Sequence, residues 1–138
     1  MSPRAKDTVA NNATTFDISD HTADMACRWL TAQCDDHAID NQVAFQITVC
    51  LAEAINNILQ HSGLDNNPIH LQCSLDSQQI IIDISHTAAR YQTSSHTSID
   101  LLKESGRGSE IMRLWTDQIH YRHLDGVNHL RLLRHYKR

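Results

Sequence analysis

The sequence has little glycine, little proline and few aromatic residues, and it carries no strong charge of either sign. Of its 138 residues, four are glycine, two are proline and 5% are aromatic, and the net charge is −4 with the histidines neutral. A weakly negative chain has no global field that attracts nucleic acid, so we expect no nucleic-acid partner. The hydrophobic fraction of 41% and the charged fraction of 20% are those of an ordinary globular protein.

Paired cysteines, zinc-binding spacings and long apolar runs are also missing. The four cysteines form no C-x-x-C pair and follow no secretory signal, which indicates free thiols in a reducing cytosol and a cytoplasmic location. The ten histidines show neither zinc-finger nor H-E-x-x-H spacing, so we expect no metal bound through histidine. No apolar run approaches the roughly 18 residues of a membrane span, and we expect no membrane association.

The hydrophobic pattern predicts a single domain at residues 13–138 that follows a flexible polar N-terminus at 1–12. The order of elements favours an α+β fold, a two-layer sandwich with helices on one face of a mixed, mainly antiparallel sheet. The predicted elements are a strand at 13–18, helices at 20–35 and 41–61, strands at 69–75 and 79–85, a polar loop at 86–98, a helix after 106–108, and strands at 118–124 and 127–136 joined by an Asp-Gly turn.

The long helix at 41–61 carries three polar residues at a spacing of four. Glu53, Asn57 and His61 line one helix face beside the apolar stripe. A carboxylate there can act as a general base towards a hydroxyl, and an amide oxygen is a suitable hard ligand for magnesium. The same spacing is typical of a solvated stripe with hydrogen bonds between successive turns, and spacing alone does not separate the two.

A Gly106-Arg107-Gly108 segment precedes the next helix. Two glycines let the backbone approach a ligand closely, and a helix N-terminus presents free N–H groups to an anion such as phosphate. The arginine adds a fixed positive charge. The same three residues are also typical of a flexible start of a helix with an arginine on the surface, so the sequence alone leaves both interpretations open.

Together these segments resemble a known arrangement. EAINNILQH at 53–61 resembles the N box of GHKL ATPases, and GRGSEIMRLWTDQIHY at 106–121 resembles the second glycine box of the bacterial anti-sigma-factor serine kinases. The long polar loop between them occupies the place of the ATP lid. The resemblance covers roughly residues 20–135, nearly the whole chain.

The resemblance implies ATP and Mg²⁺ as cofactors and a protein-serine kinase activity. Glu53 is similar to the base that activates the phosphoryl acceptor, and Asn57 is similar to the magnesium ligand. Kinases of this family phosphorylate a small anti-anti-sigma (STAS-type) protein, bind a sigma factor and often form homodimers, so we expect such partners and a homodimer. The resemblance places these residues around the nucleotide: Asn57, His61, His86, Gly106, Arg107 and Gly108.

The first glycine box departs from the family pattern. The family has D-x-G-x-x-F after the second hairpin strand, whereas this chain has His86, Ala88 and Tyr91 at those positions. The aspartate normally accepts a hydrogen bond from the adenine amino group, which an imidazole can do only through an unprotonated nitrogen. Three interpretations follow: ATP bound weakly, another nucleotide, or a nucleotide-free module that sequesters a sigma factor or a related regulator.

Two further interpretations concern the wider superfamily and the C-terminus. A histidine-kinase catalytic domain is disfavoured because no pair of dimerisation and phosphoacceptor helices is present and the lid is short. The C-terminal basic residues predict a solvated edge strand protected by charge, or a basic edge that contacts an acidic protein partner. These basic residues are Arg122, Arg131, Arg134, Lys137 and Arg138.

Overall fold

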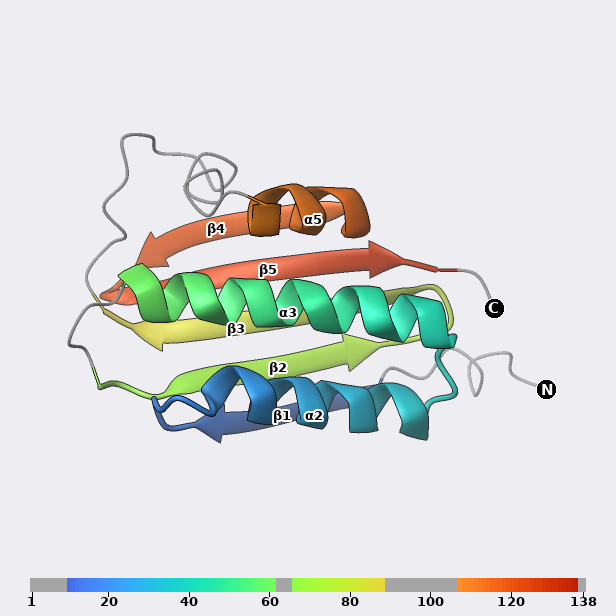
Figure 1. Ribbon diagram of the computed structural model, residues 1–138, viewed down its shortest axis with the longest axis horizontal. Coiled ribbons are helices and arrows are strands. Elements are labelled where there is room, and N and C mark those ends of the chain that lie inside the picture. The colour runs from blue at the N-terminus through green and yellow to red at the C-terminus, as the bar shows by residue number, and fades with distance from the viewer. Residues whose placement is uncertain (1–9, 62–65, 89–106, 137–138) are drawn as a thin grey trace.

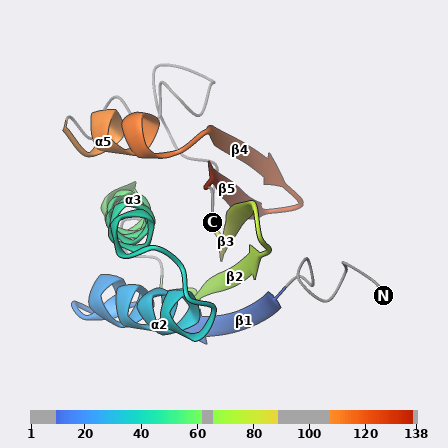
Figure 2. The ribbon, with the colours of Figure 1, turned by 90° about the vertical axis from the view of Figure 1, so that its right-hand side faces the viewer.

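The computed structural model describes residues 10–61, 66–88 and 107–136. In these ranges three helices cover one face of a five-stranded sheet (Figures 1 and 2). This arrangement confirms the predicted α+β fold class. The elements are β1 (Ala10–Phe16), α2 (Thr22–Asp36), α3 (Asn41–His61), β2 (Ile69–Leu75), β3 (Gln79–Thr87), α5 (Arg107–Trp115), β4 (Gln118–Leu124) and β5 (Val127–His135).

The strand order is β1-β2-β3-β5-β4, and every neighbouring pair is antiparallel. The predicted parallel component of a mixed sheet is therefore wrong for the described strands. Two helices, α2 and α3, connect β1 to β2, so the chain reverses its direction three times between them and these neighbouring strands run in opposite directions (Figure 1). One helix, α5, leads into β4, which runs in the same direction as β3, but β5 lies between them and removes the parallel contact.

Two predicted boundaries and one predicted position need correction. The first strand begins at Ala10, so residues 10–12 of the predicted flexible N-terminus pair with β2. The sequence pattern did not predict this start because the asparagines of β1 show no apolar alternation. An edge strand is held mainly by backbone pairing and does not need apolar side chains along its whole length. Strand β3 extends to Thr87, which places His86 in the sheet and not in the loop. The C-terminal strand β5 lies inside the sheet, and β4 is the edge.

Helix α3 is the centre of the core. Its apolar side facing the sheet and the neighbouring helices includes Ile47, Leu51 and Ile55, all fully buried. By length and composition Asn41–Gln60 could cross a membrane, but in this fold the helix packs between α2 and α5 on the sheet (Figure 2). The same apolar pattern is therefore explained by a core helix. The strands contribute alternate residues to this core: Ile69, Leu71, Cys73, Leu75, Ile80, Ile82, Ile84, Leu130 and Leu132.

Local interactions fix the turn between α2 and α3. Ala38 has a positive φ of 54°, and the amide of Ile39 donates to the carbonyl of Cys34 at 3.0 Å, which closes the end of α2. The carboxylate of Asp40 then accepts hydrogen bonds from the amides of Gln42, at 3.0 Å, and Val43. Asp40 is thus the N-cap of α3 and sets where the site-bearing helix begins.

Candidate functional site

The polar stripe of α3 lies at the border of the core. Asn57 is only 7% exposed, whereas its neighbour Asn56 is exposed. Glu53, one turn earlier, is half-buried. A solvated stripe would leave all of these side chains in water. The burial of Asn57 therefore favours the interpretation of a site over that of a solvated surface.

His86 lies on the helix-covered face of the sheet. It shares the buried face of β3 with Ile80, Ile82 and Ile84, and its side chain is fully buried. A histidine at this depth occupies a position that the alternation of β3 assigns to an apolar residue. The side chain that replaces the family's aspartate is therefore on the helix-covered face of the sheet and not in solvent.

A row of residues at the same level crosses the sheet at His86. The register pairs His86 with Ile69 of β2 and with Asn128 of β5, and Asn128 in turn pairs with His123 of β4. Asn128 is 2% exposed. Three successive strands thus present polar side chains to the helix layer at one end of the sheet.

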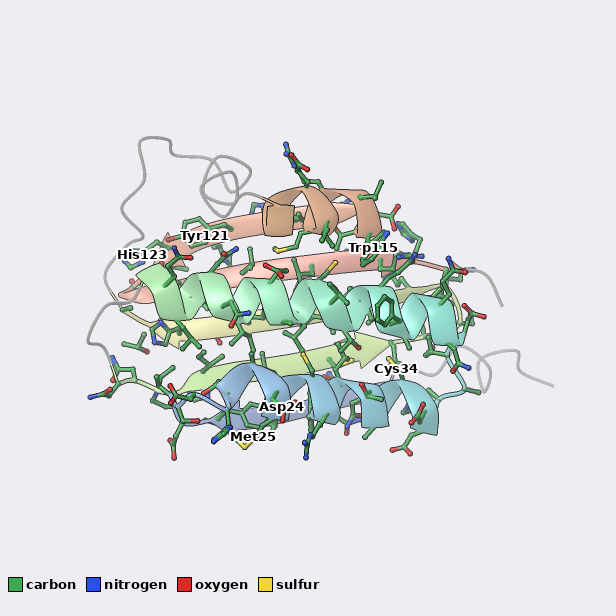
Figure 3. All side chains as sticks on the ribbon, in the orientation of Figure 1. Asp24, Met25, Cys34, Trp115, Tyr121 and His123 are labelled. Carbon is green, nitrogen blue, oxygen red and sulfur yellow. The ribbon has the colours of Figure 1, made fainter. Side chains whose placement is uncertain are left out.

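Asn128 is the centre of this polar row. Its side-chain carbonyl accepts a hydrogen bond from the hydroxyl of Tyr121, and the Nδ1 atom of His123 lies 3.0 Å from the same oxygen. Figure 3 shows Tyr121 and His123 at the end of the sheet where the last turns of α3 lie. Sequence reasoning missed these three residues. The sequence did contain one signal for Asn128. Asn128 is two and four residues before the core residues Leu130 and Leu132, so in a strand it lies on the same buried face.

Helix α5 lies beside α3 and runs in the opposite direction (Figure 1). The rings of Phe45, near the start of α3, and Trp115, at the end of α5, are 6.1 Å apart. Arg107 is eight residues before Trp115, and Glu53 is eight residues after Phe45. At a rise of about 1.5 Å per residue, both lie about 12 Å from the aromatic contact. The N-terminus of α5 is therefore level with Glu53.

The opposite end of α5 is held in place by β5 and by the turn that follows. A guanidinium N–H of Arg134 donates to the carbonyl of Trp115 at 3.0 Å, which compensates the negative end of the helix. The amide of Asp117 donates to the carbonyl of Leu133 at 2.7 Å, and the Asp117 carboxylate accepts from the amide of His135 at 2.6 Å. These contacts fix the direction in which the N-terminus of α5 points.

The thiols do not contribute reactive groups to the site. Burial raises the pKa of Cys50, one turn before Ala54 on α3, to about 12, with the charge of Arg134 lowering it and that of Glu53 raising it. Burial, and then the charge of Asp35, raise the pKa of Cys34 to about 11. Both thiols stay protonated at neutral pH and act as small apolar core residues.

The donor chemistry of the α3 residues fits magnesium. Asn57 offers an amide oxygen and Glu53 a carboxylate one turn away, and oxygen donors are the ligands that Mg²⁺ prefers. Within residues 10–61, 66–88 and 107–136, no group of three histidine, cysteine, aspartate or glutamate side chains could hold a metal without help. A magnesium ion here would need oxygens from a bound ligand, as is usual for Mg²⁺ with nucleotide phosphates.

Some predicted residues lie outside the described part of the chain. Gly106 and Tyr91 are not described, and neither are the side chains of His61 and Arg107. The structure therefore brings Asn57, Glu53 and the start of α5 to one level, and it adds His86 to the same helix-covered face.

Comparison with known proteins places this geometry in a family. A family model described as a histidine kinase-like ATPase domain matches residues 16–134. The chain belongs to this family. Over 102 residues it is 29% identical to the serine/threonine-protein kinase BtrW of Bordetella bronchiseptica, and the match covers 68% of this chain and 72% of that protein. The resemblance inferred from the two sequence boxes is thus confirmed.

The histidine kinase-like ATPase fold accommodates alanine at the altered glycine position. The described residues with positive φ outside glycine are Ala38 and Asp125, and Ala88 is not among them. The amide of Ala88 donates to the carbonyl of Gly126 at 3.1 Å, which ties the end of β3 to the β4–β5 hairpin. Ala88 therefore does not adopt a backbone angle that requires glycine.

Proposed function

We propose that this chain is an ATP-dependent protein-serine kinase that regulates an anti-sigma pathway in the cytoplasm. Asn57 holds Mg²⁺ with the nucleotide phosphates, the N-terminus of α5 binds the triphosphate, and Glu53 accepts the proton of the serine hydroxyl. The acceptor is a small STAS-type anti-anti-sigma protein, and the chain binds a sigma factor as a homodimer. The similarity to a named serine/threonine-protein kinase supports the reaction class.

The observation that carries the proposal is that Glu53, Asn57 and the N-terminus of α5 lie close to one another along the helix layer. Glu53 and Asn57 are one helical turn apart, Asn57 is buried, and the N-terminus of α5 lies level with Glu53. Backbone N–H groups and the helix dipole favour a phosphate at that N-terminus. A hydroxyl held beside Glu53 would then lie near the transferred phosphoryl group, so catalysis would come from positioning and charge neutralisation.

Nucleotide binding is tested first, by isothermal titration calorimetry with ATP and ADP, with and without Mg²⁺. We expect Mg²⁺-dependent ATP binding that Asn57→Ala weakens at least about tenfold, because loss of a metal ligand typically costs this much or more. Asn56→Ala is the matched control, since Asn56 is the adjacent asparagine on the exposed side of α3. Equal effects of the two substitutions would contradict the role of Asn57.

Phosphoryl transfer is tested separately with Mg²⁺-ATP and candidate STAS-type proteins, by mass spectrometry of phosphoserine. Glu53→Gln keeps the shape of the side chain and removes the base, so we expect ATP binding to persist and transfer to fall by about 10²-fold or more. Unchanged transfer in this variant would remove Glu53 from the reaction. Persistent absence of phosphoserine with every candidate, despite ATP binding, would remove the kinase activity.

The environment of His86 favours a second candidate, a nucleotide-free binding module. The family's carboxylate acceptor for adenine is replaced by a fully buried imidazole. His86→Asp tests this candidate: if the wild-type chain binds no nucleotide and this variant gains ATP binding, the pocket has lost its base contact and the function depends on protein partners. Wild-type binding as tight as that of the variant would exclude the module.

A further inference from the structure

The face of the sheet opposite the helices carries a polar hollow that the proposed kinase site does not use. In the described part of the chain all three helices lie on the other face (Figure 2). The hollow has a volume of about 710 Å³ and receives side chains from all five strands. Strand β5 lies inside the sheet, between β3 and β4, so its basic residues are not at an edge.

The register places most of the lining residues, including all the charged ones, in two rows that cross the whole sheet. The first row contains, from β1 to β4, Thr15, His70, Ser85, His129 and Arg122.

The second row lies two residues further along each strand. It contains Ala13, Gln72, Asp83, Arg131 and His120. Apart from one alanine, every member of the two rows is polar or charged, whereas the opposite face of the same strands is mainly apolar outside the row of His86, Asn128 and His123.

The charge of this face is positive and concentrated at the β5–β4 side. Arg131 is held by Asp83 through two hydrogen bonds, of 2.7 and 3.1 Å, so this pair is neutral. Arg122 forms no ion pair with any residue that the structure describes. Three imidazoles in the rows, those of His70, His120 and His129, add ring nitrogens that can hydrogen-bond to a ligand. The whole chain, by contrast, has a net charge of −4.

We propose that this face is a docking surface for an acidic segment of a protein partner, centred on Arg122, His129 and His120. Carboxylates of the segment would accept hydrogen bonds from the free guanidinium and from the imidazole N–H groups. Each row takes one residue from each strand, so an extended segment lying along a row would meet successive side chains at the spacing between strands. Docking here leaves the helix face open, and the proposal does not depend on the kinase assignment.

Charge and composition favour an acidic protein over other occupants. A nucleic-acid surface needs several fixed cations and aromatic platforms, but the rows have one free arginine and no Phe, Tyr or Trp. A second copy of this chain would bring the Arg122 guanidinium groups of two such faces together, and their like charges would oppose this contact.

The test titrates ¹⁵N-labelled full chain with a glutamate decapeptide and follows amide shifts and affinity. We expect the largest shifts in the two rows, at His70, Ser85, His129 and Arg122. Arg122→Glu is expected to weaken binding at least about fivefold. Arg113→Glu, at an exposed arginine on the helix side, is the matched control and is expected to leave binding unchanged.

Three outcomes would overturn the proposal. The first is shifts confined to the helix side, or equal losses in the two arginine variants. The second is tighter binding of an oligothymidylate than of the glutamate peptide at the same rows, which would make the face a nucleic-acid site. The third is a dimer in sedimentation equilibrium that Arg122→Glu dissociates or that excludes the peptide, which would make it a contact between copies.

Discussion

Replacement of Asn128 by alanine tests the polar row that the sequence alone does not reveal. The side-chain oxygen of Asn128 accepts from the Tyr121 hydroxyl and lies 3.0 Å from His123 Nδ1, and the side chain is 2% exposed. The substitution removes this acceptor from two donors of the edge strand β4. A neutral hydrogen bond contributes about 1 kcal/mol net, and a buried donor that loses its acceptor costs about 1–3 kcal/mol.

We therefore expect Asn128→Ala to lower the free energy of unfolding by about 2–4 kcal/mol. Urea denaturation followed by tryptophan fluorescence measures this change, since Trp115 lies at the junction with β4. Tyr121→Phe removes one of the two donors and is expected to cost about 1 kcal/mol. In the double variant most of that cost should disappear, which gives a coupling energy of about 1 kcal/mol.

The Asn128 prediction has a matched control variant and two results that would contradict it. Asn56→Ala, at an exposed asparagine, is expected to change stability by about 0.5 kcal/mol or less. A loss of less than about 0.5 kcal/mol for Asn128→Ala would refute the reasoning. So would additive effects of the Asn128 and Tyr121 substitutions, because they would show that the hydrogen bond contributes nothing to stability.

Three further predictions concern the helices and the core thiols. Ala38→Gly is expected to stabilise the protein by about 1 kcal/mol in thermal denaturation, because Ala38 has a φ of 54° that glycine adopts freely; a loss of stability would contradict this. Asp40→Ala is expected to cost about 1 kcal/mol through loss of the N-cap of α3, and Asp40→Asn to restore most of it. Burial, and then Cys34, raise the pKa of Cys73 from 9.0 to about 12, so above pH 9 the unfolded chain releases a proton that the folded chain keeps and stability falls as the pH rises. Cys73→Ala should reduce that slope by about 1.4 kcal/mol per pH unit in urea titrations, and an unchanged slope would show that the folded thiol ionises normally.

Much of the fold could be predicted because its periodic segments are long and consistent. The bounds of α3, β2 and β4 agree with the predicted ranges, because each has an apolar pattern of a single period from end to end. The Asp-Gly turn was equally clear, since Asp125 and Gly126 both have positive φ, as the hairpin requires. The start of β1 was missed because its exposed asparagines carry no apolar alternation, and only pairing with β2 defines it as a strand.

The candidate site could be predicted only in part. Glu53 and Asn57 follow from helical spacing within one element, and the burial that separates Asn57 from Asn56 follows only from packing against the sheet and neighbouring helices. The polar row of His86, Asn128 and His123 joins three strands whose register depends on β5 lying between β3 and β4. No local pattern contains that order, since the hairpin could equally have placed β4 next to β3.

The sequence by itself determined the elements and the family of this protein, because periodicity, turn residues and the two boxes are all local properties of the chain. Tertiary structure decided which side chains meet. It placed the basic residues of β5 inside the sheet, between β3 and β4, and it paired Arg131 with Asp83, which is 48 residues away in the sequence. It left Arg122, on the edge strand, without an ion pair to any residue that the structure describes. These outcomes depend on strand order and register, which are set by the packing of the whole chain and not by any single segment.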